Sequence, residues 1–370
     1  MGFRAPTLEG LVTQTSFSWS GRSVLVTGHT GFKGGWLSVW MHQLGARVHG
    51  YALEPPTTPN LFEAAGVEAL LASDTRADVA DLKRFTEAVS HARPEIVFHL
   101  AAQPLVRESY KDPVGTFTTN AIGTAHLLEA IRQADGVRAV VVVTSDKVYD
   151  NHESDYRYVE GDPLGGRDPY SASKASAEIV AASYRSSFFG AKGGNDARIA
   201  TARAGNVIGG GDWARGRLVP DCLRAFDMGQ PVRLRHPQAV RPWQHVLEPL
   251  AGYIRLAERL AAPEGQTFAR AWNFGPDPSD ELTVGDVADL AAHLWGEGAR
   301  VEHAAHADEP PEAGVLRLDS GQARAKLPWV PRWDLRNALE QTLIWHRAWK
   351  DGGQMLDATR SQIASYAAAV

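Results

Sequence analysis

The sequence predicts an α/β fold: a doubly wound parallel sheet joined to a smaller α/β domain. Short β-branched runs at residues 23–27, 47–52, 95–100 and 138–143 alternate with segments of helical periodicity. The runs are mostly apolar, which indicates parallel strands covered on both faces. A glycine-rich loop directly follows the first run. Strand, glycine loop and helix in that order open many doubly wound domains.

Helices are expected between and after these strands. The first follows the glycine loop, and Gly45 ends it. Its apolar residues recur at helical spacing: Trp36, Leu37, Trp40, Met41 and Leu44. Further helical patterns cover residues 124–132, 247–260 and 283–295.

The sequence pattern changes after about residue 205, where glycines and prolines separate short elements. We therefore divide the chain into an N-terminal extension (1–22), a sheet domain (23–205, with returning segments near 243–275) and a discontinuous substrate-binding domain (206–370).

Composition narrows the class of protein. The 370 residues include 38 basic and 43 acidic side chains, a balance that argues against nucleic acid or a membrane as partner. Cys222 is the only cysteine, so no intrachain disulfide forms. No run approaches the roughly 20 apolar residues of a membrane span, and residues 1–20 lack a signal-peptide pattern. We expect a cytoplasmic protein without a metal site.

The glycine loop spaces Gly28, Gly31 and Gly34 as G-x-x-G-x-x-G. Small residues there let backbone N–H groups approach a pyrophosphate at a helix N-terminus, although a tight turn is the alternative. We expect Phe32 and Lys33 to contact the same dinucleotide. The second strand does not end in the usual acidic residue, but Glu54 is nearby and no arginine is. This pattern favours NAD over NADP.

Asp78 stands where a third strand is expected to end. It is a candidate to accept a hydrogen bond from the adenine amino group. The alternative is an N-cap for a helix covering residues 79–89.

Two groups of residues carry the chemistry. Tyr170 and Lys174 are four residues apart and therefore share a helix face, with a helix-start signal at residues 168–169. A tyrosine whose phenolate is favoured by a lysine can take a proton as hydride leaves the same carbon.

Ser145, Asp146 and Lys147 follow a buried strand, at the end where doubly wound sheets bind ligands. Taken singly, they also suit a turn, an N-cap and a solvated charge. Together with the Tyr–Lys pair they predict a catalytic site.

These residues resemble the extended short-chain dehydrogenase/reductase family of nucleotide-sugar enzymes, and within it the CDP-sugar dehydratases. The resemblance runs from about residue 23 to about residue 339. Its most specific pieces are residues 27–37, 55–63, 144–149, 203–213 and 241–246.

The resemblance implies that CDP-glucose loses water while hydride passes from C4 to NAD and then to C6. Tyr170 would take the hydroxyl proton, Ser145 would bind the C4 oxygen, and Asp146 would protonate the departing C6 hydroxyl. Lys147 occupies the place of a glutamate base in the dTDP- and GDP-sugar relatives. It can take the C5 proton only when neutral; alternatively it stays charged and stabilises the enolate.

The family also implies binding residues. Besides Tyr170 and Lys174, further cofactor contacts are expected at Leu100, Ala101, Ala102, Gln103, Asn120 and Thr144. Substrate contacts are expected at Arg107, Asn206, Arg235, Arg241 and Asn273. Residues 309–313 depart from the dTDP-sugar relatives, where an arginine contacts phosphate.

Two other functions share parts of this pattern. A sugar 4-epimerase would use the glycine loop, Tyr170 and Lys174, but would not need Asp146 and a second proton-transfer group. A non-catalytic nucleotide sensor would need none of these catalytic groups. The family also implies a homo-oligomer, a dimer or tetramer, paired through the helix over residues 170–189, whose small residues permit close packing: Ala172, Ala175, Ala177, Ala181 and Ala182.

Overall fold

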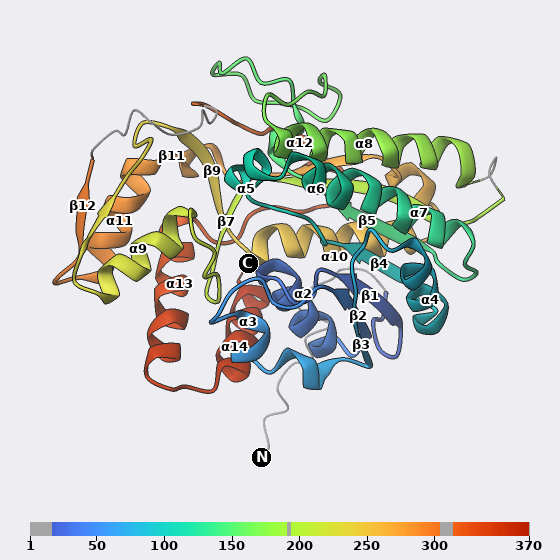
Figure 1. Cartoon of the computed structure of the whole chain (residues 1–370), viewed down its shortest axis with the longest axis horizontal. Helices are drawn as coiled ribbons and strands as arrows, with labels where there is room; N and C mark the ends of the chain where they lie inside the picture. The colour runs from blue at the N-terminus through green and yellow to red at the C-terminus, as the bar shows by residue number, and fades with distance from the viewer. Residues whose placement is uncertain (1–16, 191–193, 304–313, 370) are drawn as a thin grey trace.

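The computed structural model describes residues 17–190, 194–303 and 314–369. Its centre is a sheet of seven strands, all parallel, in the order β10-β6-β5-β4-β1-β2-β3 (Figure 1). From one edge to the other the strands are β10 (Ala271–Phe274), β6 (Arg198–Ala204), β5 (Ala139–Val143), β4 (Ile96–His99), β1 (Ser23–Thr27), β2 (Arg47–Ala52) and β3 (Ser73–Arg76).

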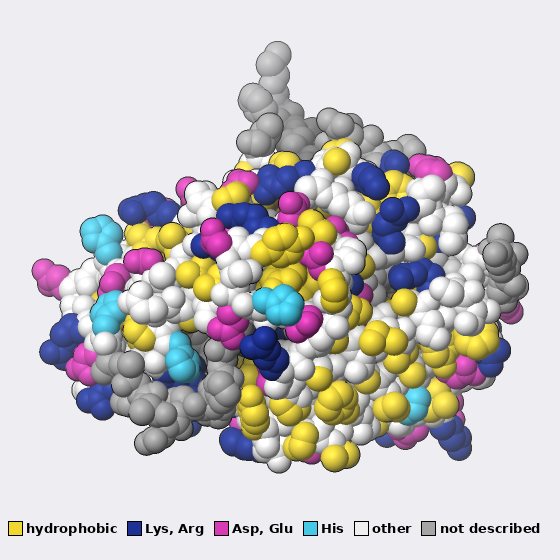
Figure 2. Space-filling view, turned by 90° about the horizontal axis from the view of Figure 1, so that it is seen from above, with side chains coloured by type: hydrophobic (Ala, Val, Ile, Leu, Met, Phe, Trp, Pro, Cys, Tyr) yellow, Lys and Arg dark blue, Asp and Glu magenta, His cyan; other side chains and the backbone are white. Residues whose placement is uncertain are grey.

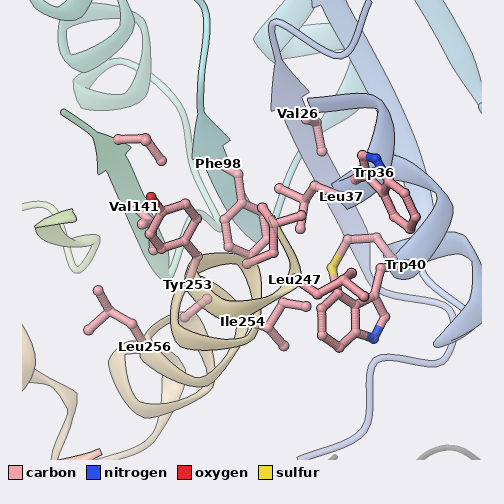
Figure 3. Close-up of a cluster of buried hydrophobic side chains, with 14 of the residues drawn as sticks. Val26, Trp36, Leu37, Trp40, Phe98, Val141, Leu247, Tyr253, Ile254 and Leu256 are labelled. Carbon is pink, nitrogen blue, oxygen red and sulfur yellow. The ribbon is translucent and has the colours of Figure 1, made fainter. Parts of the chain in front are cut away.

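Helices cover both faces of this sheet, as a doubly wound fold requires. One face carries α2 (Phe32–Gln43), α10 (Leu247–Ala261) and α14 (Met355–Ala368); the other carries α4 (Leu82–Ala92), α7 (Gly123–Arg132) and α8 (Pro169–Phe188). Successive strand residues alternate between the two layers: Val24 and Val26 pack in the first and Leu25 in the second. Figure 3 shows α10 laid against the sheet, with Leu247 and Ile254 facing the helix that carries Trp36 and Trp40.

Shorter helices connect the strands of the large sheet. They are α3 (Leu61–Ala64), α5 (Val106–Lys111) and α6 (Pro113–Phe117), which a π-helix (Thr118–Ile122) joins to α7.

The second part of the molecule is smaller and lies to one side of the large sheet (Figure 1). It contains the three-stranded sheet β11-β9-β7 and the pair β12-β8. Its strands are β7 (Asn206–Ile208), β8 (Pro231–Arg233), β9 (Val240–His245), β11 (Glu281–Thr283) and β12 (Arg300–Glu302). Its helices α9 (Leu218–Asp227), α11 (Val284–Trp295) and α13 (Leu335–Lys350) share a third hydrophobic cluster. Helix α12 (Gly321–Lys326) lies beside β10.

The observed elements confirm the predicted fold class. The four predicted strands and the predicted helices are present, with ends that differ by at most a few residues. The proposed domain limits stay a prediction, although α10 and β10 do return to the large sheet. The described end of the N-terminal extension is tied down: Trp19 is buried and donates to Glu258 at 2.9 Å. Within the described ranges, no helix combines the length and apolarity needed to cross a bilayer.

Candidate active site

A cleft of about 1460 Å³ opens at the carboxyl ends of β1, β4 and β5, between the large sheet and the smaller part. Single-ligand pockets commonly measure about 300–1,000 Å³, so this cleft has room for two ligands side by side. Its lining includes the following predicted residues: Gly28, Gly31, Phe32, Lys33, Gly34, Asp78, Leu100, Ala101, Ala102, Arg107, Thr144, Ser145, Asp146, Lys147, Tyr170, Lys174, Asn206, Arg235 and Arg241.

The glycine loop forms the cradle that a pyrophosphate needs. A Cβ on Gly34 would lie 2.1 Å from the carbonyl oxygen of Gly28, and Gly28 itself has a φ of 74°. Helix α2 begins at N-cap Gly31, and within the described chain no side chain caps it and no acidic residue occupies its first turn. Its first N–H groups are therefore available to an anion.

One expectation, that no arginine lies near the end of the second strand, is wrong. Arg76, at the end of β3, donates to Glu54 at 2.8 Å, so an arginine does lie beside the second strand's end. Arg76 also donates to both oxygens of Asp74, which bonds His29 of the glycine loop at 2.9 Å. The carboxylates of Glu54 and Asp74 both accept from the Arg76 guanidinium. Because they offset its charge, this region remains unfavourable for the 2′-phosphate of NADP.

Asp78 lines the cleft, while Asp81 caps α4 through its bond with the N–H of Arg84. The alternative of Asp78 as that helix's N-cap is therefore wrong. Asp78 Oδ1 accepts from the N–H of Ala80 at 2.9 Å, which fixes the carboxylate at the end of β3.

Two predicted cofactor contacts support the site from behind. Among the described residues, Gln103 and Asn120 do not line the cleft. The N–H of Gln103 donates to Asn120, and Asn120 donates to Ser173 on α8. Thr27 accepts from the N–H of Ala101 at 3.1 Å. These bonds hold the loop after β4 against the glycine loop and α8.

The strand-end residues meet at the floor of the cleft. Ser145 ends the extended strand and accepts from the N–H of Lys147, which turns the chain into a short 3-10 helix. The Ser145 hydroxyl donates to Asp146 Oδ1 at 2.9 Å. Asp146 Oδ2 is buried and has no hydrogen-bond partner among the described residues. Burial raises the pKa of Asp146, against the opposing charges of Lys147 and Arg241.

Tyr170 and Lys174 reach this floor from the first turns of α8, which Asp168 caps. Burial raises the pKa of Tyr170 to about 12, opposed by a hydrogen bond with Ser145. Burial lowers the pKa of Lys174 to about 8, opposed by the charge of Glu178. The Lys174 ammonium donates to the carbonyl oxygen of Val143 at 3.1 Å, so it lies at the end of β5.

A buried ion pair that the sequence did not reveal stands behind Lys174. Glu178 accepts from Arg203 and from the hydroxyls of Thr144 and Thr201. Although burial alone would raise the pKa of Glu178, these hydrogen bonds and the Arg203 charge hold it below its usual value. Through its bond with Thr144, Glu178 fixes the residue between the end of β5 and Ser145.

The predicted substrate residues divide into two groups. Arg107, Asn206, Arg235 and Arg241 line the cleft. Asn273 does not: it is fully buried in β10 and bonds Tyr149, Tyr158 and Asp319. Its expected nucleotide contact is therefore wrong, because the amide is used to tie loops to the sheet edge. The segment 309–313 lies outside the described residues.

Two cationic residues of the smaller part were missed. Arg215 and Arg217 line the cleft, and Arg217 stands at the N-terminus of α9, held by Asp212 at 2.8 Å. The signal available in the sequence was a basic residue, Arg217, directly before the apolar helical pattern of α9. Lys33 was expected only as part of the glycine loop. Burial and the charges of Arg217 and Lys174 lower its pKa to about 7, while Asp146 opposes the shift.

The fold, the glycine cradle and the Tyr–Lys pair agree with what known proteins show. Residues 24–273 match the model of the NAD dependent epimerase/dehydratase family. The chain belongs to this family. This member of the NAD dependent epimerase/dehydratase family has its Tyr–Lys pair in the lining of the cleft.

Relatives with known names narrow the comparison. The chain is 48% identical over 355 residues to a CDP-glucose 4,6-dehydratase of Salmonella typhimurium, covering 95% of this chain and 98% of that protein. It is 30% identical to a dTDP-glucose 4,6-dehydratase of Streptomyces antibioticus, covering 88% and 92%. Among solved structures, MoeE5 in complex with UDP-glucuronic acid and NAD superposes with a TM-score of 0.73 at 26% identity, covering 88% and 99%.

Proposed function

We propose that this protein is a nucleotide-sugar 4,6-dehydratase that converts CDP-glucose to CDP-4-keto-6-deoxyglucose and water. The observation that carries the proposal is the meeting of Asp146 and Lys147 with Tyr170 on one floor of the cleft. A 4-epimerase needs the tyrosine but not two further proton-transfer groups. The 48% identity to a CDP-glucose 4,6-dehydratase supports CDP-glucose as the substrate.

The glycine loop, Asp78, the loop after β4 and Lys174 are the residues that would hold NAD. NAD, when bound, accepts hydride from C4 of the sugar and returns it at C6. The chain's own part is to position the cofactor through backbone N–H groups at α2 and to exclude a 2′-phosphate through the carboxylates of Glu54 and Asp74, which accept from Arg76.

Each strand-end residue has one proposed role. Tyr170 removes the C4 hydroxyl proton, assisted by the Lys174 ammonium, and Ser145 hydrogen-bonds the C4 hydroxyl. The resulting ketone acidifies C5–H. Asp146, whose burial favours the protonated carboxyl, gives its proton to the departing C6 hydroxyl. The arrangement therefore provides an acid, placed beside the base that elimination also requires.

Lys147 is the proposed C5 base. It is half-buried, lines the cleft and follows Asp146 directly in the chain. A lysine accepts a proton only in its neutral form; a charged lysine would instead stabilise the enolate. If Lys147 takes part in this step, removing its amine slows the exchange of the substrate's C5 hydrogen with solvent.

The substrate's pyrophosphate is proposed to lie against the cations of the smaller part. Arg217, Arg235 and Arg241 of the smaller part line the cleft, as does Arg107 of α5. Planar guanidinium groups suit phosphate oxygens. The sugar would then lie on the floor of the cleft, next to Asp146.

Mass analysis after incubation with CDP-glucose and NAD tests the proposal. We expect a product lighter by one water. An isomer of equal mass, separated from CDP-glucose by chromatography before the mass analysis, would indicate an epimerase, and an unchanged substrate would indicate a nucleotide-binding protein.

We also propose that the chain forms a homo-oligomer through α8 and its neighbours. Three of the expected contact residues, Ala175, Ala177 and Ala181, are buried within the chain itself and cannot be shared. Large apolar side chains are exposed instead on α6, the π-helix and α8: Val114, Phe117, Ile122, Ile179 and Phe188. Figure 2 shows the molecule from above, with hydrophobic side chains lying among charged ones in the middle of that view. Sedimentation of the wild type and of Ile179→Asp tests the proposal, because a charge there should dissociate the oligomer.

A further inference from the structure

Tyr253 is a fully buried tyrosine whose hydroxyl has no evident structural task. It lies on α10, with its ring between Phe98 and Val141 (Figure 3) and its edge against Phe274 at 5.5 Å. Its hydroxyl has no hydrogen-bond partner anywhere in the described part of the chain. A buried hydroxyl without a partner is costly, and phenylalanine would fill the same space without that cost. The tyrosine therefore calls for a reason beyond packing.

Asp146, Tyr170 and Lys33 lie near this tyrosine. Asp146 Oδ2 is also buried and without a partner among the described residues. Burial is the main cause that raises the pKa of Tyr253, and the charges of Tyr170 and Asp146 add to it, which places both groups near the phenol. On the cleft side, Lys33 Nζ lies 5.7 Å from the centre of the Tyr253 ring. Helix α10 thus brings the Tyr253 side chain near Lys33 of α2 and near Asp146, which follows β5.

We propose that Tyr253 is a positioning residue for Asp146. Its hydroxyl donates, through one water molecule shared with Lys33, to the Oδ2 of the carboxylate that forms when Asp146 protonates the departing hydroxyl. The inference rests on the proposed dehydratase function. Three polar partners are what one ordered buried water requires. The bond strengthens only as the Asp146 charge develops, so it favours the transition state over the ground state.

The charge on Asp146 is balanced from every side that faces it. Ser145 donates to Oδ1. Lys147 follows it in the chain, and Arg241 approaches from β9. Lys33 comes from α2, Tyr170 from α8 and Tyr253 from α10. Of these groups, Tyr253 is the one that can be changed without altering the cleft lining, because it lies beneath it.

Tyr253→Phe tests the inference. We expect the melting temperature to stay the same or rise, because the variant loses an unpartnered hydroxyl. We expect kcat for water loss from CDP-glucose to fall about tenfold, the order of one hydrogen bond to a charged group. The carboxylate is less stabilised in the variant, so the pKa of Asp146 rises and the alkaline limb of the kcat profile moves to higher pH.

Tyr366→Phe is the matched control. Tyr366 is equally buried on α14, but its hydroxyl donates to Glu248 at 2.6 Å, remote from the cleft. This variant should lose stability and keep the wild-type pH profile. A Tyr253→Phe enzyme with wild-type kcat and pH profile would overturn the inference, as would a loss of activity that only follows a loss of folded protein.

A readout without turnover separates this inference from the proposed function. Carbon-13 NMR titration of the Asp146 carboxyl should show a higher pKa in Tyr253→Phe than in the wild type, whatever the substrate. An unchanged Asp146 titration rejects the inference. Failure of the wild type to release water from CDP-glucose rejects the proposed function instead.

Discussion

Arg203 holds the carboxylate of Glu178 through two parallel hydrogen bonds, Nε to Oε1 and Nη2 to Oε2, both 2.9 Å long. Both side chains are about 4% exposed, so neither charge is solvated in place of its partner. Glu178 lies one helical turn after Lys174 on α8, and Arg203 lies on β6 beside β5. The pair therefore joins the helix of the Tyr–Lys pair to the strands that carry the acid.

Removing one member of this pair should cost far more than removing both. We expect Arg203→Met to lower the free energy of unfolding by about 3–5 kcal/mol, because it leaves the Glu178 charge buried without compensation. Arg203→Met combined with Glu178→Gln should recover part of that loss. Urea unfolding measures both variants. Equal losses in the single and double variants would contradict a coupled pair.

Asp146→Asn should separate catalysis from stability. Turnover should fall by roughly 10²- to 10⁴-fold, because the general acid is lost. The raised pKa of Asp146 means that the folded protein binds its proton more tightly than the unfolded chain does. The associated stability is therefore present below the unfolded pKa of about 3.9 and is lost as pH rises through the folded pKa.

Asparagine removes this pH-dependent loss. Relative to the wild type, Asp146→Asn should gain stability as pH rises from about 4 to 7, measured by denaturant unfolding at several pH values. A stability difference that is constant over this range would show that Asp146 titrates normally.

Gly205→Ala should damage the site without touching a catalytic group. A Cβ there would lie 2.4 Å from Pro242 Cγ and 3.2 Å from Asp146 Oδ2. Such overpacking costs about 1–3 kcal/mol, and the displaced carboxyl should lower kcat. Gly161→Ala is the control, because nothing among the described atoms lies within 4 Å of a Cβ there. Calorimetry and turnover should change in the first variant only.

Lys147→Met keeps the length of the side chain and removes its amine. We expect exchange of the substrate's C5 hydrogen with deuterated solvent to fall by roughly 10²-fold or more, together with turnover. Mass analysis of recovered substrate and product measures the exchange. Exchange and turnover near the wild-type level would exclude a role for Lys147.

Local sequence patterns predicted the elements whose structure is determined by residues close together in the chain. Apolar runs gave β1 and β5, and the Asp168-Pro169 signal gave the start of α8. Strand register cannot be read in this way. Arg76 reaches Glu54, 22 residues earlier, because β2 pairs with β3, and no local pattern shows that pairing.

The same limit explains two other errors. Asn273 matched a family motif, but β10 pairs with β6 at the sheet edge and the amide serves loops brought there by tertiary contacts. The small residues of α8 suggested an exposed packing face. Several of them instead pack against the chain's own elements, because helical periodicity does not say which side of a helix faces outward.

The position of α10 and β10 in the large sheet has a consequence for how the protein is made. The first 205 residues leave the ribosome well before α10, which covers one face of the sheet with Leu247, Leu250 and Ile254. Until α10 has emerged, the part of that apolar face that α10 covers is exposed, and until β10 has emerged β6 is an unpaired edge of the sheet. A chaperone that shields exposed hydrophobic strands would act in this interval, and a fragment ending at residue 205 would aggregate rather than bind NAD.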